Sequence, residues 1–216
     1  HSGQADEALT QVEDLINNVV TDNPIYHCFL ISALVIVSFF RGDLTRSVNE
    51  AIRLEDRAQS CGFKFSHSLS IYFRSCSELQ WGDFEAAAQR FEIFVQRRYT
   101  VPRHRAFDTM AGFALCHQLL QDERAATLAA RNLTNFTREL NDAYGLEIAR
   151  SCEARIQLMQ GDVDRAARRA EFDSRPPEFY AMHFAMEVPA IVQARVWVAL
   201  GTKESLDRAY KLLRDI

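Results

Sequence analysis

A short turn motif recurs about every forty residues along this chain. Each copy ends an apolar stretch and begins a polar one, and the central residues of the copies, which we call the anchors, are Gly42, Gly82, Gln121, Gly161 and Gly201. The anchors are 40, 39, 40 and 40 residues apart. Glycine can end one helix, and an Asp or Thr directly after it can cap the next. The spacing therefore predicts a repeated unit of two helices, A and B, joined at the anchor.

The composition and the flanking stretches agree with this prediction. Only 8 Gly and 5 Pro occur in 216 residues, which is few for an all-β chain with its many turns. Apolar stretches that we expect to be A helices cover residues 25–40, 66–80, 104–120, 144–160 and 183–200. Amphipathic stretches that we expect to be B helices cover 43–60, 83–98, 122–140, 162–171 and 203–216, and residues 4–18 resemble the B helix of an earlier unit.

Small residues recur at two fixed offsets from the anchors. Seven residues before them stand Val35, Ser75, Ala114, Ala154 and Ala194, and five after them stand Ser47, Ala87, Ala126, Ala166 and Leu206. Four of the five are small at each offset, with Val35 and Leu206 as the exceptions. Large residues follow twelve after the anchors, at Leu54, Phe94, Leu133, Asp173 and Leu213, with Asp173 the exception. This alternation predicts helix crossings at the small residues. The prolines at 176 and 177 predict a longer loop over 172–180.

The turn glycine and the small residues of both helices resemble the tetratricopeptide repeat, whose unit is usually about 34 residues long. The longer unit found here implies longer helices. The resemblance implies an all-α, right-handed α-solenoid of about five helix pairs, which we expect to be one domain over residues 1–216. The expected units cover about 25–60, 66–100, 103–140, 143–171 and 178–216.

A more specific resemblance lies near the end of the chain. The run Glu187 to Gly201, EVPAIVQARVWVALG, is similar to a stretch late in the repeats of MalT-like bacterial transcription regulators, and the segment from Arg175 to Tyr180 fits its lead-in. Gln193 and Pro189 depart from the usual residues. His1-Ser2-Gly3 looks like a tag scar, and the chain stops within an apparent helix, so we expect a fragment of a longer protein.

This second resemblance implies a cytoplasmic sensor and regulatory module. Such a module binds a small-molecule inducer or a regulatory protein on its concave face, with self-association as a further option, and ATP belongs to a separate upstream domain. The alternative is a general tetratricopeptide-type protein-interaction scaffold. A third option, the helical domain of an enzyme, is the least favoured.

The sequence lacks the motifs of several other functions. It contains no G-x-x-x-x-G-K-[ST], G-x-G-x-x-G or G-x-S-x-G motif and no recognisable DNA-reading helix. We therefore expect no enzyme activity, no cofactor and no direct DNA contact. The net charge of −4 argues against a polyanion binder as a whole. The apolar run 25–40 is shorter than the roughly 20 residues of a membrane span, so we expect a buried helix and no membrane contact.

Pairs of metal-ligand and cysteine residues give only weak signals. His104 with Asp108, and His183 with Glu187, lie four residues apart and offer two ligands each, too few for a metal site. The five cysteines have no C-x-x-C spacing, which favours reduced thiols. Cys76 and Cys116 lie almost in register on consecutive A helices, so a redox pair is an alternative to simple buried packing.

Arginines gather in two places. Residues 97–105 hold four of them beside Tyr99, a pattern that suits either an anion site or, as we favour, a solvated loop. Arg165, Arg168 and Arg169 are interpreted in the same way, as the outer face of a B helix.

The concave face of a solenoid, lined by A helices, is its broadest continuous surface. Polar or aromatic residues at the offsets expected to face inward are Tyr72, Asp108, Gln118, Arg155 and Arg195, and we predict that ligand or partner contacts centre on them. Arg155 and Arg195 share one offset, so their charges need compensation. Either an acid such as Glu153 or Glu187 supplies it, which we favour, or an anionic ligand does.

Overall fold

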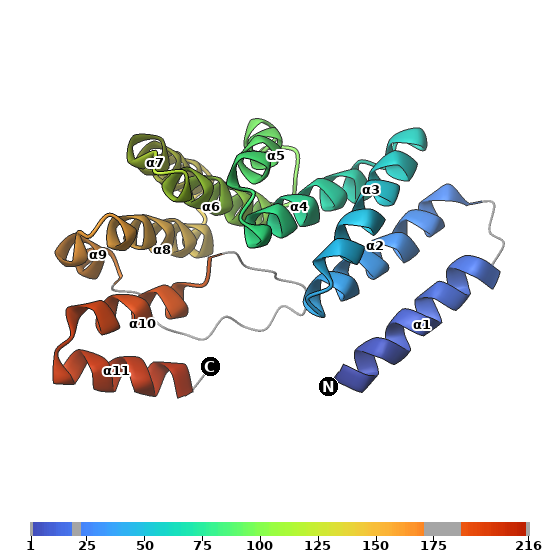
Figure 1. Ribbon diagram of the computed structural model, residues 1–216. Helices are drawn as coiled ribbons and strands as arrows, with labels where there is room; N and C mark the ends of the chain where they lie inside the picture. The colour runs from blue at the N-terminus through green and yellow to red at the C-terminus, as the bar shows by residue number, and fades with distance from the viewer. Residues whose placement is uncertain (1, 19–22, 171–186, 215–216) are drawn as a thin grey trace. The chain divides into compact units, whose positions relative to one another are not determined.

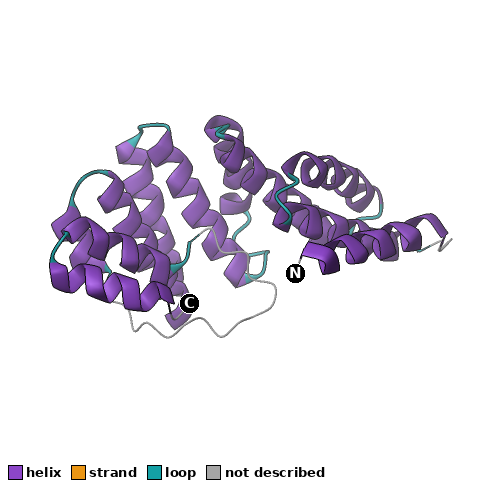
Figure 2. Ribbon diagram, turned by 60° about the horizontal axis from the view of Figure 1, so that its bottom comes forward, coloured by secondary structure: helices purple, strands orange, loops and turns teal. Residues whose placement is uncertain are grey.

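The computed structural model describes residues 2–18, 23–170 and 187–214. Within these ranges the chain forms eleven helices and no strand, so the predicted all-α helical repeat is confirmed (Figure 2). The chain divides into two compact units, His1–Ile93 and Phe94–Ile216. The single domain expected from the sequence stays a prediction.

The helices follow the predicted order of A and B stretches. The first five are α1 (Ser2–Asn18), α2 (Pro24–Phe40), α3 (Leu44–Ser60), α4 (Lys64–Trp81) and α5 (Phe84–Gln96), of which α5 crosses the boundary between the units (Figure 1). The remaining helices, all in the second unit, are α6 (Arg103–Leu119), α7 (Glu123–Glu139), α8 (Ala143–Met159), α9 (Val163–Arg169), α10 (Pro189–Leu200) and α11 (Lys203–Arg214). The loop predicted at 172–180 lies outside the described residues.

The five anchors are the turns between A and B helices. All five have a positive φ, between 63° at Gln121 and 85° at Gly82. The side chain after each anchor accepts a hydrogen bond from a backbone N–H in the first turn of the B helix, as in Asp122 with Ala125 at 2.9 Å. The other four caps are Asp43, Asp83, Asp162 and Thr202. The repeat therefore rests on local backbone chemistry that the sequence displays directly.

The predicted helix crossings are confirmed in the first four units. The small residues seven before the anchors are all buried, and so are Ser47, Ala87, Ala126 and Ala166 five after them. The prediction for the last unit is wrong, because Leu206 is 45% exposed and its neighbour Ser205 is buried. Leu213 is also exposed, and Asp173 lies outside the described residues.

The difference at α11 follows from what covers each B helix. The following A helix packs on α3 and α7, whereas α11 packs on α10 alone within the described part of the chain. Only residues that face α10, such as Ser205 and Ala209, are then buried. A shift of one position turns a helical side chain by about 100°. This turn places Leu206 on the uncovered side of α11.

The core of the second unit lies between α6, α7 and α8. Phe107, Leu133, Phe136 and Ile148 are buried there, and the rings of Phe107 and Phe136 meet edge to face with centroids 5.9 Å apart. A smaller cluster that includes Ala154, Val192 and Val196 joins α8, α9 and α10. These two clusters fix the three helices α7, α8 and α9 as consecutive neighbours.

The first unit has a similar core. Buried residues include Val35 on α2, Leu54 on α3 and Phe73 on α4. The Arg90 Nε donates to Glu78 Oε1 at 2.6 Å and ties α5 to α4. The apolar run predicted to be a core helix forms α2, in which seven residues are buried. No helix within the described ranges is long and apolar enough to cross a membrane.

Candidate functional site

The five residues predicted to bind a ligand differ widely in exposure. Tyr72 on α4 is 3% exposed and belongs to the first unit, and the other four belong to the second unit. Asp108 and Gln118 on α6 are buried, Arg155 on α8 is partly buried, and Arg195 on α10 is exposed. As a ligand site, the set stays a prediction, and its accessible members are the two arginines.

Two of these residues, Asp108 and Arg155, meet at Glu187, just before α10. The Arg155 Nη1 donates to Glu187 Oε2 at 3.1 Å, and the Ser151 hydroxyl donates to Oε1 at 2.5 Å. The backbone N–H of Glu187 donates to Asp108 Oδ1 at 3.3 Å. Side chains from α6 and α8 thus hold the chain at the start of α10.

Glu187 is almost completely buried, at 2% exposed for the whole residue. Burial raises its pKa, while the charges of Arg155 and Arg195 and the hydrogen bond from Ser151 lower it by less. Glu187 is therefore the acid that compensates Arg155. Glu153, the other acid considered from the sequence, instead faces Arg169 on α9.

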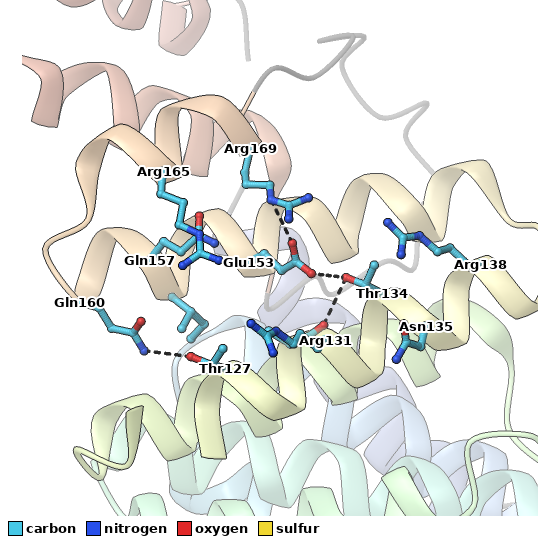
Figure 3. A pocket seen from close by; sticks show the side chains of 12 residues that line it. Thr127, Arg131, Thr134, Asn135, Arg138, Glu153, Gln157, Gln160, Arg165 and Arg169 are labelled. Carbon is cyan, nitrogen blue, oxygen red and sulfur yellow. Dashed lines mark hydrogen bonds and ion pairs between the residues drawn. The ribbon is translucent and has the colours of Figure 1, made fainter. Parts of the chain in front are cut away.

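A groove lies along α7, α8 and α9, and each helix contributes one stripe of side chains (Figure 3). Its cavity volume is about 290 Å³. The α7 stripe follows helical spacing from Thr127 to Arg138, and the α9 wall carries Arg165 and Arg169. The complete lining is Thr127, Ala130, Arg131, Thr134, Asn135, Arg138, Glu153, Ile156, Gln157, Gln160, Arg165 and Arg169.

The groove is strongly cationic, with four arginines and one glutamate in its lining. Glu153 is 9% exposed; it accepts a hydrogen bond from the Thr134 hydroxyl at 2.6 Å and lies 3.3 Å from the Arg169 Nε. No carboxylate of the described residues forms an ion pair with Arg131, Arg138 or Arg165. Only one of the four guanidinium groups is therefore neutralised from within this part of the chain.

Two amide side chains lie at one end of the groove. The Gln157 Oε1 is buried and has no hydrogen-bond partner among the described residues. The Gln160 Nε2 donates to Gln118 Oε1 at 2.8 Å. Gln118, which was predicted from the sequence to face a ligand, therefore contacts the groove residue Gln160. The buried oxygen of Gln157 is the one polar atom of the groove lining, as described, that is buried without a partner.

Sequence reasoning did not find this groove. Arg165 and Arg169 were interpreted as a solvated face, and Arg131 and Arg138 were not singled out. The available signal was that each pair shares a helix face, at spacings of seven and four residues. That signal alone does not say which two helix faces lie on either side of one groove.

The basic segment of residues 97–105 makes contacts within the second unit. The Arg98 guanidinium lies over the Tyr99 ring, 4.7 Å from its centroid, and the Tyr99 hydroxyl donates to Glu139 Oε2 at 2.9 Å. Arg103 lies 3.8 Å from Asp142. Residues 97–102 form a mostly exposed turn, in agreement with the solvated loop favoured from the sequence, whereas residues 103–105 begin α6.

The cysteine and metal hypotheses gain no support. All five cysteines are thiols, and Cys76 and Cys116 are both buried but belong to different units. Cys28 and Cys61, both in the first unit, have sulfur atoms 3.9 Å apart. No three His, Cys, Asp or Glu side chains of the described residues gather in a way that could hold a metal ion, and His183 lies outside those residues.

Comparison with known proteins identifies the fold and no family. No protein-family model and no curated protein sequence matches the chain. The crystal structure of BtubC (BKLC) from P. vanneervenii is similar, with a TM-score of 0.65 at 16% identity over 99% of this chain and 89% of that chain. A tetratricopeptide repeat protein from Parabacteroides merdae gives a TM-score of 0.48 at 13% identity, over 97% of this chain and 86% of that one. The similarity to BtubC, at this low identity, concerns the fold alone. The helical repeat itself is seen in the order of the helices and in the five turns described above.

Proposed function

We propose that this chain is a protein-interaction module that binds an acidic segment of a partner in the groove of α7, α8 and α9. The observation that carries the proposal is the excess of three positive charges in the lining, four arginines against one glutamate, on a chain whose net charge is −4. Guanidinium groups give directional, charge-assisted hydrogen bonds to carboxylates and phosphates. The groove is thus a local exception to the charge of the whole protein.

The shape of the groove supports a peptide segment rather than a compact ligand. From Thr127 to Arg138 the α7 wall runs about 16 Å, at about 1.5 Å per residue. An extended chain covers that length with roughly five residues. Amide side chains at Asn135, Gln157 and Gln160 can donate to and accept from a peptide backbone.

The proposal is tested with synthetic peptides of equal length and graded negative charge, by fluorescence anisotropy. Affinity is expected to rise with negative charge and to fall as salt is added. The double variant Arg131→Ala/Arg138→Ala should lose this binding. Arg168→Ala removes a neighbouring exposed arginine that does not line the groove, so it should bind like the wild type. Equal affinity for neutral and acidic peptides would contradict the proposal.

A more specific proposal is that the module is the sensor region of a MalT-like transcription regulator. The run from Glu187 to Gly201 supports it, because that run is similar to a stretch late in the repeats of those regulators. In this proposal an inducer or regulatory protein contacts Tyr72, Asp108, Gln118, Arg155 and Arg195.

The sensor proposal is tested in the full-length protein that contains this chain. A P-loop domain before it and a helix-turn-helix domain after it are expected, and the variant Arg155→Ala/Arg195→Ala should lose the response to inducer. Stability of that variant is measured separately, because Arg155 also pairs with Glu187. A stable double variant with an unchanged response would remove these residues from the site.

A further inference from the structure

We propose that the groove of α7, α8 and α9 binds a phosphorylated serine or threonine of the partner, with the phosphate held between Arg131 and Arg165. This inference deepens the proposed function and rests on it. It specifies the charged group, its place in the groove and the residue beside it.

The first step concerns which arginines are available. Glu153 lies near the middle of the groove in Figure 3 and is engaged by Arg169 and Thr134. Arg131, Arg138 and Arg165 have no ion-pair partner among the described residues. An incoming anion meets these three without first having to displace a carboxylate of the described part of the chain.

The second step concerns their placement. Figure 3 shows Arg131 on the α7 wall and Arg165 on the α9 wall, both at the Gln157 end of the groove, and Arg138 at the opposite end beside Asn135. Two cations from opposite walls therefore face one end, and one cation faces the other. The Glu153 carboxylate lies between the two ends and is paired with Arg169, so this pair offers no net positive charge to an anion placed at the centre.

The third step concerns the charge that such a pair requires. A phosphate monoester carries about −1.5 to −2 charges at pH 7 and three strong acceptor oxygens. It can accept bidentate hydrogen bonds from two guanidinium groups at once. A carboxylate has a single charge and two oxygens, so it leaves one of the two arginines without full compensation. The Arg131 and Arg165 end is thus matched to a dianion.

The Gln157 side chain also lines that end of the groove and is partly exposed. Its amide N–H groups are hydrogen-bond donors. In this proposal one of them adds a hydrogen bond to a phosphate oxygen.

The single arginine at the other end suits a single charge. Arg138 is separated from Arg131 by two turns of α7, about 10 Å along the axis. An extended peptide covers this distance with about three residues. The proposal therefore includes an acidic residue roughly three positions from the phosphorylated one.

The experiment compares peptides that differ in one side chain, with the complete 216-residue chain as receptor. One peptide carries phosphoserine, a second Asp at that position and a third Ser, each with an acidic residue at the flanking position. The phosphoserine peptide is expected to bind at least about tenfold tighter than the Asp peptide, a ratio that corresponds to about 1.4 kcal/mol. Arg131→Ala and Arg165→Ala should each remove most of this preference, and Arg168→Ala should keep it.

A second set of peptides tests the flanking contact. Replacing the flanking acid of the peptide by Ala should weaken its binding to the wild-type protein. The same replacement should not change its binding to the Arg138→Ala variant, as expected if the acid and Arg138 interact directly. If the flanking acid matters equally in both receptors, the predicted register along the groove is wrong.

The outcomes separate the two proposals. Equal affinity for phosphoserine and Asp peptides, both lost in Arg131→Ala, would overturn the phosphate inference and keep the acidic-partner function. No binding of any acidic peptide would overturn both. If inorganic phosphate binds with the same affinity as the phosphopeptide, the ligand is a free anion. If a single-stranded oligonucleotide binds more tightly than the phosphopeptide, the ligand is a nucleic acid. Either result would overturn the inference.

Discussion

Arg155 and Glu187 form an ion pair at 3.1 Å that fastens the segment before α10 to α8. The side chain of Glu187 is 3% exposed, and the side chain of Arg155 is 20% exposed. Removing one member of a buried pair leaves the other charge without compensation. The pair therefore stabilises the position of α10 in the second unit.

Replacing Arg155 with Met is expected to lower the free energy of unfolding by about 3 kcal/mol at neutral pH, because Glu187 then stays buried and unpaired. Urea denaturation followed by circular dichroism measures the change. Arg150→Met alters an exposed arginine on the same helix and should cost less than about 0.5 kcal/mol. Adding Glu187→Gln to Arg155→Met should restore part of the loss, and a double variant less stable than the single one would contradict this account.

The raised pKa of Glu187 predicts a specific pH dependence. Its usual pKa is near 4.5, and burial raises it in the folded protein. The folded state then binds the proton more tightly than the unfolded state, so this group favours folding below pH 4.5 and loses that contribution as pH rises through the raised value. The stability of the wild type relative to Glu187→Gln should fall over this window. If the stability of the wild type relative to Glu187→Gln instead rises with pH, the charge of Arg155 affects the pKa of Glu187 more strongly than burial does.

Ala114 and Ala154 lie at helix crossings and are 0% exposed. Replacement of either by Phe should overpack the crossing and cost about 1–3 kcal/mol or more. Thermal melts of the purified variants check this prediction. Ala199 on α10 is exposed, so Ala199→Phe provides a control of equal size. Melting at the wild-type temperature would place the crossings elsewhere.

Gly145 on α8 has no room for a side chain. A Cβ there would lie 2.6 Å from a carbon of the Phe107 ring and 3.0 Å from Thr137 Cγ2. Gly145→Ala should therefore destabilise by about 1–3 kcal/mol, although alanine favours a helix by up to about 1 kcal/mol. Combination with Phe107→Leu makes room, so the double variant should cost less than the sum of the two single changes. Additive costs would show that the ring does not cause the clash.

Gln121 is the one anchor that is not glycine, yet it has a φ of 63°. A side chain in this region costs roughly 1–2 kcal/mol, partly offset by the lower chain entropy of the unfolded state. Gln121→Gly is therefore expected to stabilise the protein by about 0.5–1 kcal/mol. Gly161→Ala makes the reverse change at an equivalent turn, with a φ of 82°, and should destabilise it by about 1 kcal/mol. If both variants change the free energy of unfolding in the same direction, this account of the turn is wrong.

The repeat can be predicted from local sequence, because each turn is made by residues that are neighbours in the chain. Positive φ at the anchor and a capping side chain one residue later are local requirements, and Gly161 with Asp162 displays both. Small residues at a fixed distance from the turn then follow from helix geometry, which is why Ala114 and Ala126 were placed correctly. The same reasoning failed at Leu206, where burial depends on which helices cover α11.

Which charged side chains meet depends on how the helices pack in three dimensions. Both Glu153 and Glu187 were sequence candidates to compensate Arg155, and the packing of α8 against the start of α10 selected Glu187. Arg131 and Arg165 lie on helices that α8 separates in the chain, and no local pattern places them on opposite walls of one groove. The direction of an exposed side chain is set by how whole helices rotate against one another, and that rotation is fixed by the buried contacts of the core.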